Sequence, residues 1–205
     1  MWGQIMAIYS CNHKSVGRKT HRAGTASAHV RYIARSGANP VLLSSHIPAN
    51  SNEASTWLYR EEQKDRKNAR VIDKIMVAIP RELNQAQRQK LINDYVAGIT
   101  QNRIPWLVAI HQTGHDVHNP HAHIVLRDRD IKTGKRYMRL SDSRRDWRKT
   151  GRGQDTPTDW LRERWQHYAN TALKHAGHKA RIDRRTLEAQ AGQPQPVNAM
   201  SILTP

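Results

Sequence analysis

The sequence has no phenylalanine and a single cysteine, Cys11, among its 205 residues. One thiol excludes a disulfide framework and any zinc or iron–sulfur site built from several cysteines. No apolar run approaches the roughly 18 residues that a transmembrane helix needs, and the N-terminus lacks the charged start and long apolar stretch of a secretory signal. These absences favour a soluble intracellular protein without a membrane span, and the length favours one medium-sized domain.

Acidic residues are also scarce. The chain has 17 Asp and Glu against 34 Lys and Arg, which gives a net charge of +17. Such an excess is typical of proteins that bind a polyanion, most often a nucleic acid. Six tryptophans and six tyrosines supply bulky groups for a core and for stacking on bases. A basic nucleic-acid-binding domain and an enzyme that acts on nucleic acid both fit this composition.

Hydrophobic periodicity predicts an α+β fold with about five strands and three or four helices. Strands are expected over residues 3–10, 70–79, 106–113 and 121–128, with a hairpin turn within 131–141. Helices are expected over residues 26–35, 54–68, 84–99 and from Thr158 to about Gly177. Loops or connections are expected over residues 11–25, 38–53 and 142–157. Residues 1–191 are expected to form the domain and residues 192–205 a flexible tail.

Histidines gather on two neighbouring predicted strands. Side chains two apart on a strand share a face, so His121 and His123 point the same way. An antiparallel pairing with the preceding strand brings His111 within reach of both. Three neutral imidazoles form a good set of ligands for a divalent transition metal and leave coordination positions open. They add no negative charge, so the site attracts a phosphodiester.

Two further features surround this predicted metal site. Continued alternation places Arg127 and Arg129 on the histidine face, where they add to the positive field. Asp116 lies in the turn between the two strands and is a candidate to orient an imidazole through its second nitrogen. The alternative is that these histidines decorate a surface strand and bind nothing.

The chemistry of such a site depends on its nucleophile. The chain has no His-Glu-x-x-His sequence and no Gly-x-x-x-x-Gly-Lys-Ser/Thr loop, which argues against a zinc protease and a P-loop nucleotidase. For a phosphodiester, water and a tyrosine remain as nucleophiles. Tyr32 is the best tyrosine, because it lies off the apolar stripe of its predicted helix between Arg31 and Arg35. Spacing alone leaves open that Tyr32 is an ordinary surface residue.

Residues 127–152 form a strongly basic segment that contains aromatic side chains. Single strands are commonly held by positive charge along the backbone and by aromatic platforms for the bases. The candidates for these contacts are Arg127, Arg129, Arg136, Tyr137 and Trp147. The alternative is a solvated basic loop with only nonspecific affinity.

A family resemblance rests on these same residues. The run His-Asn-Pro-His-Ala-His at residues 118–123, with His111 before it and Arg129 after it, resembles the metal-binding motif of the MobA/MobL family. These proteins are plasmid mobilisation relaxases of the HUH endonuclease group. Other similar blocks lie at residues 6–9, 27–37, 66–80, 165–177, 180–183 and 185–190, so that the resemblance covers roughly residues 6–191.

The resemblance implies a central antiparallel sheet flanked by helices and a definite reaction. Tyr32 would attack the phosphodiester at the nic site of a plasmid transfer origin, leaving a 5′-phosphotyrosyl link, and would later rejoin the strand. His111, His121 and His123 would hold Mg²⁺ or Mn²⁺. The implied partners are single-stranded origin DNA, auxiliary mobilisation proteins, and a coupling protein with a type IV secretion channel. The implied location is the bacterial cytoplasm, with export on the linked DNA.

Two alternatives and one departure stay open. A rolling-circle replication initiator or transposase of the HUH group shares the chemistry, although not the Thr-Leu-Glu-Ala-Gln block at residues 186–190. A noncatalytic nucleic-acid-binding domain shares only the charge. Family members commonly carry a glutamate in the strand that here holds Lys74 and Met76, and alternation turns the adjacent Asp73 to the opposite face. Asp116 is then the candidate to replace that acid.

Overall fold

The computed structural model describes residues 8–185 and contains a five-stranded sheet in which all neighbouring strands are antiparallel. The spatial order is β1-β3-β5-β4-β2. The strands are β1 (Cys11–Gly17), β2 (Val41–Ser45), β3 (Arg70–Ala78), β4 (Trp106–His111) and β5 (His121–Leu126). The fold class predicted from the sequence, α+β with a central antiparallel sheet of about five strands, is confirmed.

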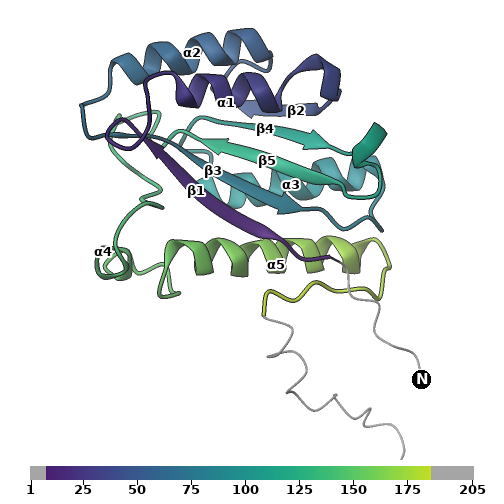
Figure 1. The fold of residues 1–205 in the computed structure, drawn as a ribbon. Coiled ribbons are helices and arrows are strands. Elements are labelled where there is room, and N and C mark those ends of the chain that lie inside the picture. The colour runs from purple at the N-terminus through teal and green to yellow at the C-terminus, as the bar shows by residue number, and fades with distance from the viewer. Residues whose placement is uncertain (1–7, 186–205) are drawn as a thin grey trace, which may run out of the picture.

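Helices cover both faces of the sheet (Figure 1). The helices α1 (Thr25–Ile33) and α2 (Ser51–Gln63) lie together on one face, and α3 (Gln85–Thr100) and α5 (Pro157–His175) lie on the other. A short helix α4 (Arg144–Arg148) precedes α5, and single 3₁₀ turns occur at Ser36–Ala38 and Gly114–Asp116. The sheet is therefore the middle layer of three.

The alternation of side chains along each strand divides the core in two. Ile75 and Ile124 pack with α3 and α5, whereas Leu107 and Val125 pack with α1 and α2. Apolar groups fill both faces at the centre of the sheet because β3, β5 and β4 are buried on both sides. The predicted histidines replace apolar residues on the α1 face at the start of β5 and the end of β4, where the second core stops.

Capping residues explain where the long helices begin. The Asn84 side chain accepts a hydrogen bond from the Gln87 amide, and the Gln87 side chain accepts one from the Asn84 amide. The helix α5 begins one residue before the expected Thr158 cap, because Thr156 caps the Asp159 amide and Pro157 occupies the first turn. The start of α2 is likewise earlier than predicted, with Asn50 as its cap.

Three predicted loop regions contain regular structure. The first described strand is Cys11–Gly17, where the sequence predicts a loop; residues 8–10 are not in a strand, and residues 3–7 lie outside the described part. The connection predicted at residues 38–53 contains β2 and the start of α2, and residues 142–157 contain α4. Conversely, residues 131–141 form turns and no strand pair. The predicted tail, residues 192–205, and the boundary at 191 lie outside the described residues.

Candidate active site

Strand register brings the three predicted histidines together. His111 of β4 lies directly opposite His121 of β5, and His123 lies two residues further along β5 on the same face. The ring centroids of His111 and His121 are 5.1 Å apart, those of His111 and His123 5.3 Å, and those of His121 and His123 5.1 Å. The three imidazoles therefore form one cluster, as the alternation and the antiparallel pairing predict.

Backbone carbonyls fix which ring nitrogen remains available in two of the histidines. His111 Nε2 is 3.0 Å from the Ile33 carbonyl oxygen, and His121 Nδ1 is 2.9 Å from the Asn119 carbonyl oxygen. A carbonyl only accepts, so each of these nitrogens carries the proton and donates. Nδ1 of His111 and Nε2 of His121 are left as acceptors. Metal-binding histidines are commonly oriented by such a bond from the other nitrogen.

Asp116 lies at the edge of this cluster. Its Oδ2 is 3.7 Å from His111 Nδ1. His111, Asp116 and His121 each offer one ligand atom, and these atoms lie within 4.8 Å of one another. This donor set of two imidazole nitrogens and one carboxylate oxygen fits a divalent cation; His123, the third predicted ligand, is not part of this group, although its ring lies beside the other two. Since Nδ1 of His111 is an acceptor here, Asp116 is placed to bind the cation itself, and the Ile33 carbonyl is the group that orients His111.

The environment of His111 and His123 favours the neutral form of these two rings. Burial lowers the pKa of His123 to about 4, and the neighbouring His121, His111 and His29 contribute to this shift. Burial and the neighbouring His121 also lower the pKa of His111. A neutral imidazole is the form that binds a metal, so the His111 and His123 rings can act as ligands near neutral pH.

The helix α1 lies across the histidine cluster and carries Tyr32. The Ile33 carbonyl receives the His111 hydrogen bond, and the ring of His29 is 6.4 Å from that of His123. Tyr32 stands three residues after His29, so both side chains lie on the same flank of the helix. The Tyr32 side chain is 62% exposed, and the Arg35 guanidinium lies 4.3 Å from its ring centroid. Tyr32 is thus exposed to solvent on the flank of α1 that also carries His29.

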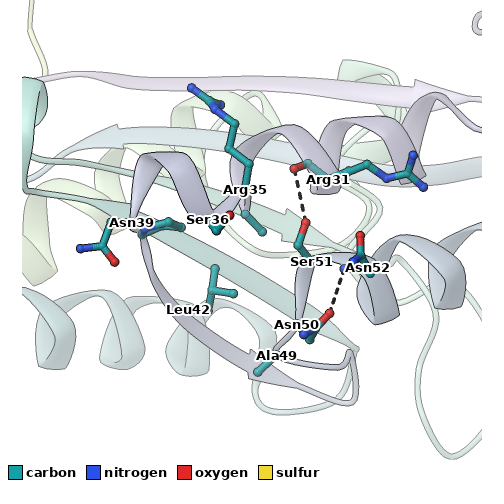
Figure 2. Close-up of a pocket in the computed structure, with 11 residues that line it drawn as sticks. Arg31, Arg35, Ser36, Asn39, Leu42, Ala49, Asn50, Ser51 and Asn52 are labelled. Carbon is teal, nitrogen blue, oxygen red and sulfur yellow. Dashed lines mark hydrogen bonds between the residues drawn. The ribbon is translucent and has the colours of Figure 1, made fainter.

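A polar pocket of about 500 Å³ lies between the C-terminal end of α1, β2 and the start of α2 (Figure 2). Arg31 and Arg35 belong to its lining, and Leu42 contributes apolar surface. The Ser51 hydroxyl donates a hydrogen bond to the Arg31 carbonyl and ties the two helices together at this point. The Arg35 guanidinium therefore lies next to the predicted nucleophile, whereas the Arg31 guanidinium bonds to the Ser55 hydroxyl of α2.

Two of the predicted DNA-binding residues are buried, and that prediction is wrong for them. Arg127 is 3% exposed and makes a bidentate pair with Asp65, with N–O distances of 2.7 and 3.0 Å. The strand β5 ends at Leu126, so alternation no longer places Arg127 on the histidine face. Trp147 is fully buried against Trp160. Neither residue has a surface left for a nucleotide.

The other three predicted DNA-binding residues are partly exposed but already have partners. Arg129 bonds to Asp65, and Arg136 bonds to Asp128 and Asp142. The ring of Tyr137 lies beneath the guanidinium of Arg103, 4.3 Å from its centroid. Contact between DNA and Arg129, Arg136 or Tyr137 stays a prediction.

His29 and Lys14 are candidate site residues that the sequence pattern did not reveal. They line a second cleft of about 480 Å³ together with Lys74, Met76 and His123. His29 could have been found from its helical spacing to Tyr32, since residues three apart share a flank. Lys14 could not, because its segment is predicted to be a loop.

Comparison with known proteins identifies relatives over most of the chain. Mobilization protein A of Escherichia coli is 33% identical over 205 residues, which is 90% of this chain and 28% of that protein. The 43 kDa relaxation protein of Salmonella typhimurium is 28% identical over 211 residues, which is 90% of this chain and 55% of that protein. The chain therefore spans about a quarter of the length of the first relative and about half of the length of the second.

A solved structure described as the molecular basis of vancomycin resistance transfer in Staphylococcus aureus has a similar fold. Its TM-score is 0.60, and the match covers 88% of this chain and 100% of that one. At 19% identity this likeness concerns the fold alone. Residues 17–203 match the MobA/MobL family. The resemblance found in the histidine motif is thereby confirmed, and the chain belongs to the MobA/MobL family.

Proposed function

We propose that this protein is a mobilisation relaxase that nicks single-stranded DNA at a plasmid transfer origin and later rejoins it. One observation carries the proposal. Three histidine rings meet under the end of α1, the same helix that presents an exposed Tyr32. The relatives named for mobilization and relaxation support it.

In the proposed reaction, the Tyr32 hydroxyl loses its proton and its oxygen attacks the scissile phosphorus. A bond forms between that oxygen and phosphorus, and the bond from phosphorus to the 3′ oxygen breaks. The 3′ oxygen takes up a proton and leaves as a hydroxyl, while the 5′ phosphate stays on Tyr32. One phosphodiester replaces another, so the reverse attack by a 3′ hydroxyl rejoins a strand.

His111, His121 and His123 are the residues proposed to hold a divalent cation, with Asp116 beside His111. Bound Mg²⁺ or Mn²⁺ would polarise the phosphate and stabilise the charge that develops on its oxygens. The protein orients two of the rings through the Ile33 and Asn119 carbonyls. Ile33 directly follows Tyr32 in α1, so the hydrogen bond from His111 to the Ile33 carbonyl connects the histidine cluster to the helix that carries the proposed nucleophile.

The wider setting follows from this reaction. The substrate is plasmid DNA, so we place the protein in the bacterial cytoplasm, from which it would pass to a recipient cell while linked to the strand. Auxiliary mobilisation proteins would expose the single strand, and a coupling protein and type IV secretion channel would carry it. Within residues 8–185, no helix is long and apolar enough to span a bilayer.

A covalent-adduct assay tests the proposal. Protein, Mn²⁺ and a labelled single strand of the transfer origin are incubated, and the mixture is run on a denaturing gel. We expect a labelled protein band that EDTA abolishes and that Tyr32→Phe lacks while still binding the strand. Tyr59→Phe, an exposed tyrosine on α2, is the matched control and keeps the band.

The result also separates the alternatives. A noncatalytic binding domain gives no band with any variant. A rolling-circle initiator or transposase gives a band with its own origin and not with a transfer origin. A band that persists in Tyr32→Phe would place the nucleophile elsewhere. Tyr9 is the next candidate, although burial raises its pKa well above the usual range and its hydroxyl lies buried without a partner among the described residues.

A further inference from the structure

Two lysines face each other across β1 and β3. Lys14 and Lys74 are Cα partners in the antiparallel register, and directly opposite side chains have Cβ atoms about 5 Å apart. Lys74 lies two residues before Met76, which is the partner of His123. Both lysines therefore occupy the same sheet face as the histidine cluster, close to its His123 end.

No acid compensates this pair within the described part of the chain. The cleft that they line also contains Asn12, His13 and His29, together with Ile75, Met76 and His123, and none of these is acidic. Neither lysine belongs to an ion pair found between residues 8 and 185. The nearest acid along β3, Asp73, is buried on the opposite face, where its carboxylate is hydrogen-bonded to Ser15 and His13.

Like charges placed directly opposite each other on a sheet are destabilising. Burial lowers the pKa of Lys74, and the charge of Lys14 lowers it further. The fold therefore keeps a repulsive pair beside the candidate active site. An anion bound between the two ammonium groups would remove the repulsion.

We propose that Lys14 and Lys74 bind one backbone phosphate of the single-stranded DNA, next to the phosphate held at the histidine cluster. The cleft of about 480 Å³ has the size of a small-ligand site, and it continues to His123. Contacts to backbone phosphates position a strand without reading its sequence. The subsite thus fixes the strand so that the neighbouring phosphodiester lies at Tyr32. This inference rests on the proposed function, since it names a further contact to the same substrate.

The salt dependence of single-strand binding tests this subsite. We would measure the anisotropy of a fluorescein-labelled oligo(dT) of about 20 nucleotides, a length that exceeds a typical single-strand site, with Tyr32→Phe protein in EDTA. Neither cleavage nor metal then contributes. The plot of log affinity against log salt has a negative slope. When one phosphate fewer is neutralised, this slope becomes shallower by about 0.7, and the affinity at about 0.1 M salt decreases about fivefold. We expect this change in Lys14→Gln/Lys74→Gln. Lys14→Arg/Lys74→Arg keeps the charges and is expected to keep the slope.

Lys90→Gln/Lys174→Gln is the matched control, because it removes the same charge from α3 and α5, which cover the opposite face. An equal decrease of the slope in this control would overturn the subsite and indicate a general charge effect. An unchanged slope in the Lys14/Lys74 glutamine variant would also overturn it. Thermal unfolding checks the fold, and removing the repulsion is expected not to lower the melting temperature. Failure of the proposed function is distinct: the wild-type protein would then form no covalent adduct, whatever the slope.

Discussion

Asp65, two residues after the end of α2, is an acidic residue that pairs with two arginines. Its carboxylate accepts hydrogen bonds from Arg127 and Arg129, and the Arg127 guanidinium also donates to the Val71 and Glu61 carbonyls. The Asp65 and Arg127 side chains are both buried, with exposures of 4% and 3%. This arrangement turns a residue that looks like a DNA contact in the sequence into a structural one.

Asp65→Asn is therefore expected to destabilise the protein by about 3 kcal/mol, because removing one partner of a buried ion pair leaves an uncompensated charge. Urea unfolding followed by circular dichroism measures this change. Asp94→Asn breaks the exposed Lys90–Asp94 pair on α3 and is expected to cost no more than about 0.5 kcal/mol. Equal midpoints for Asp65→Asn and wild type would show that Arg127 is not held as described.

The histidines next to α1 give stability a defined pH dependence. His29 and His123 have pKa values lowered from 6.5 to about 4, mainly by burial. The unfolded chain therefore binds more protons between these values, and stability falls as the pH decreases from about 6.5 to about 4. Above and below that window, these two groups add no slope.

His29→Asn/His123→Asn is expected to flatten the pH dependence in this window. The urea midpoint, measured in EDTA across the interval between the folded and unfolded pKa values, reports the slope. His175→Asn changes an exposed residue in the last turn of α5 and is expected to keep the wild-type slope. A double variant as acid-sensitive as wild type would contradict the assigned burial of the two rings.

At the scale of elements, strands are predictable where apolar residues alternate or run continuously. The strands β3, β4 and β5 are buried on both faces, so their patterns are strong, and the sequence predicts all three. The strand β1 escapes prediction because Asn12, His13, Lys14 and Ser15 are polar. It lies at the edge of the sheet and is specified by its long pairing with β3, which no local pattern reveals.

The residues of the candidate site also divide into those that a local pattern predicts and those that depend on pairing between distant segments. His111, His121 and His123 are predictable because a two-residue period and one short turn determine their positions. The burial of Arg127 is not, because its partner Asp65 lies 62 residues away. The position of Lys14 is not predictable either, since it requires the register of β1 against β3. Local period can be read from one sequence, whereas pairing between distant segments cannot.

The packing of α3 against α5 depends on Gly98. A Cβ at this position would lie 1.9 Å from the Tyr168 hydroxyl oxygen and 2.7 Å from its ring carbon Cζ. Alanine normally stabilises a helix relative to glycine, but here it would force the two helices or the Tyr168 ring to move. Gly98→Ala is therefore expected to destabilise the protein by about 1–3 kcal/mol, measured by thermal unfolding.

Two variants test that explanation for Gly98. In a Tyr168→Ala background, where the obstructing ring is absent, Gly98→Ala is expected to be neutral or stabilising. Gly37→Ala is the surface control, because a Cβ there meets nothing within 4 Å. Equal destabilisation by Gly98→Ala with and without the Tyr168 ring would contradict the close approach of the two helices.

At the scale of the whole molecule, the positive charge of +17 is unevenly compensated. Several basic side chains between residues 127 and 155 are paired with acids from the same region or with Asp65, as Arg136 is with Asp128 and Asp142. Arg31 and Arg35, by contrast, bond to neutral groups, the Ser55 hydroxyl and the Tyr32 carbonyl. Uncompensated charge therefore lies on the α1 side of the sheet, beside Tyr32.

This distribution predicts where a single strand binds. In the Tyr32→Phe background, Arg31→Gln/Arg35→Gln is expected to lower both the affinity for a single-stranded oligonucleotide and its salt slope, by about 0.7 for each phosphate that is no longer neutralised. Arg136→Gln/Arg139→Gln removes the same charge and is expected to keep the slope while lowering the melting temperature, because Asp128 and Asp142 would then be without these partners. If Arg136→Gln/Arg139→Gln made the salt slope shallower and Arg31→Gln/Arg35→Gln did not, the single strand would bind along residues 127–152, as the composition of that segment predicts.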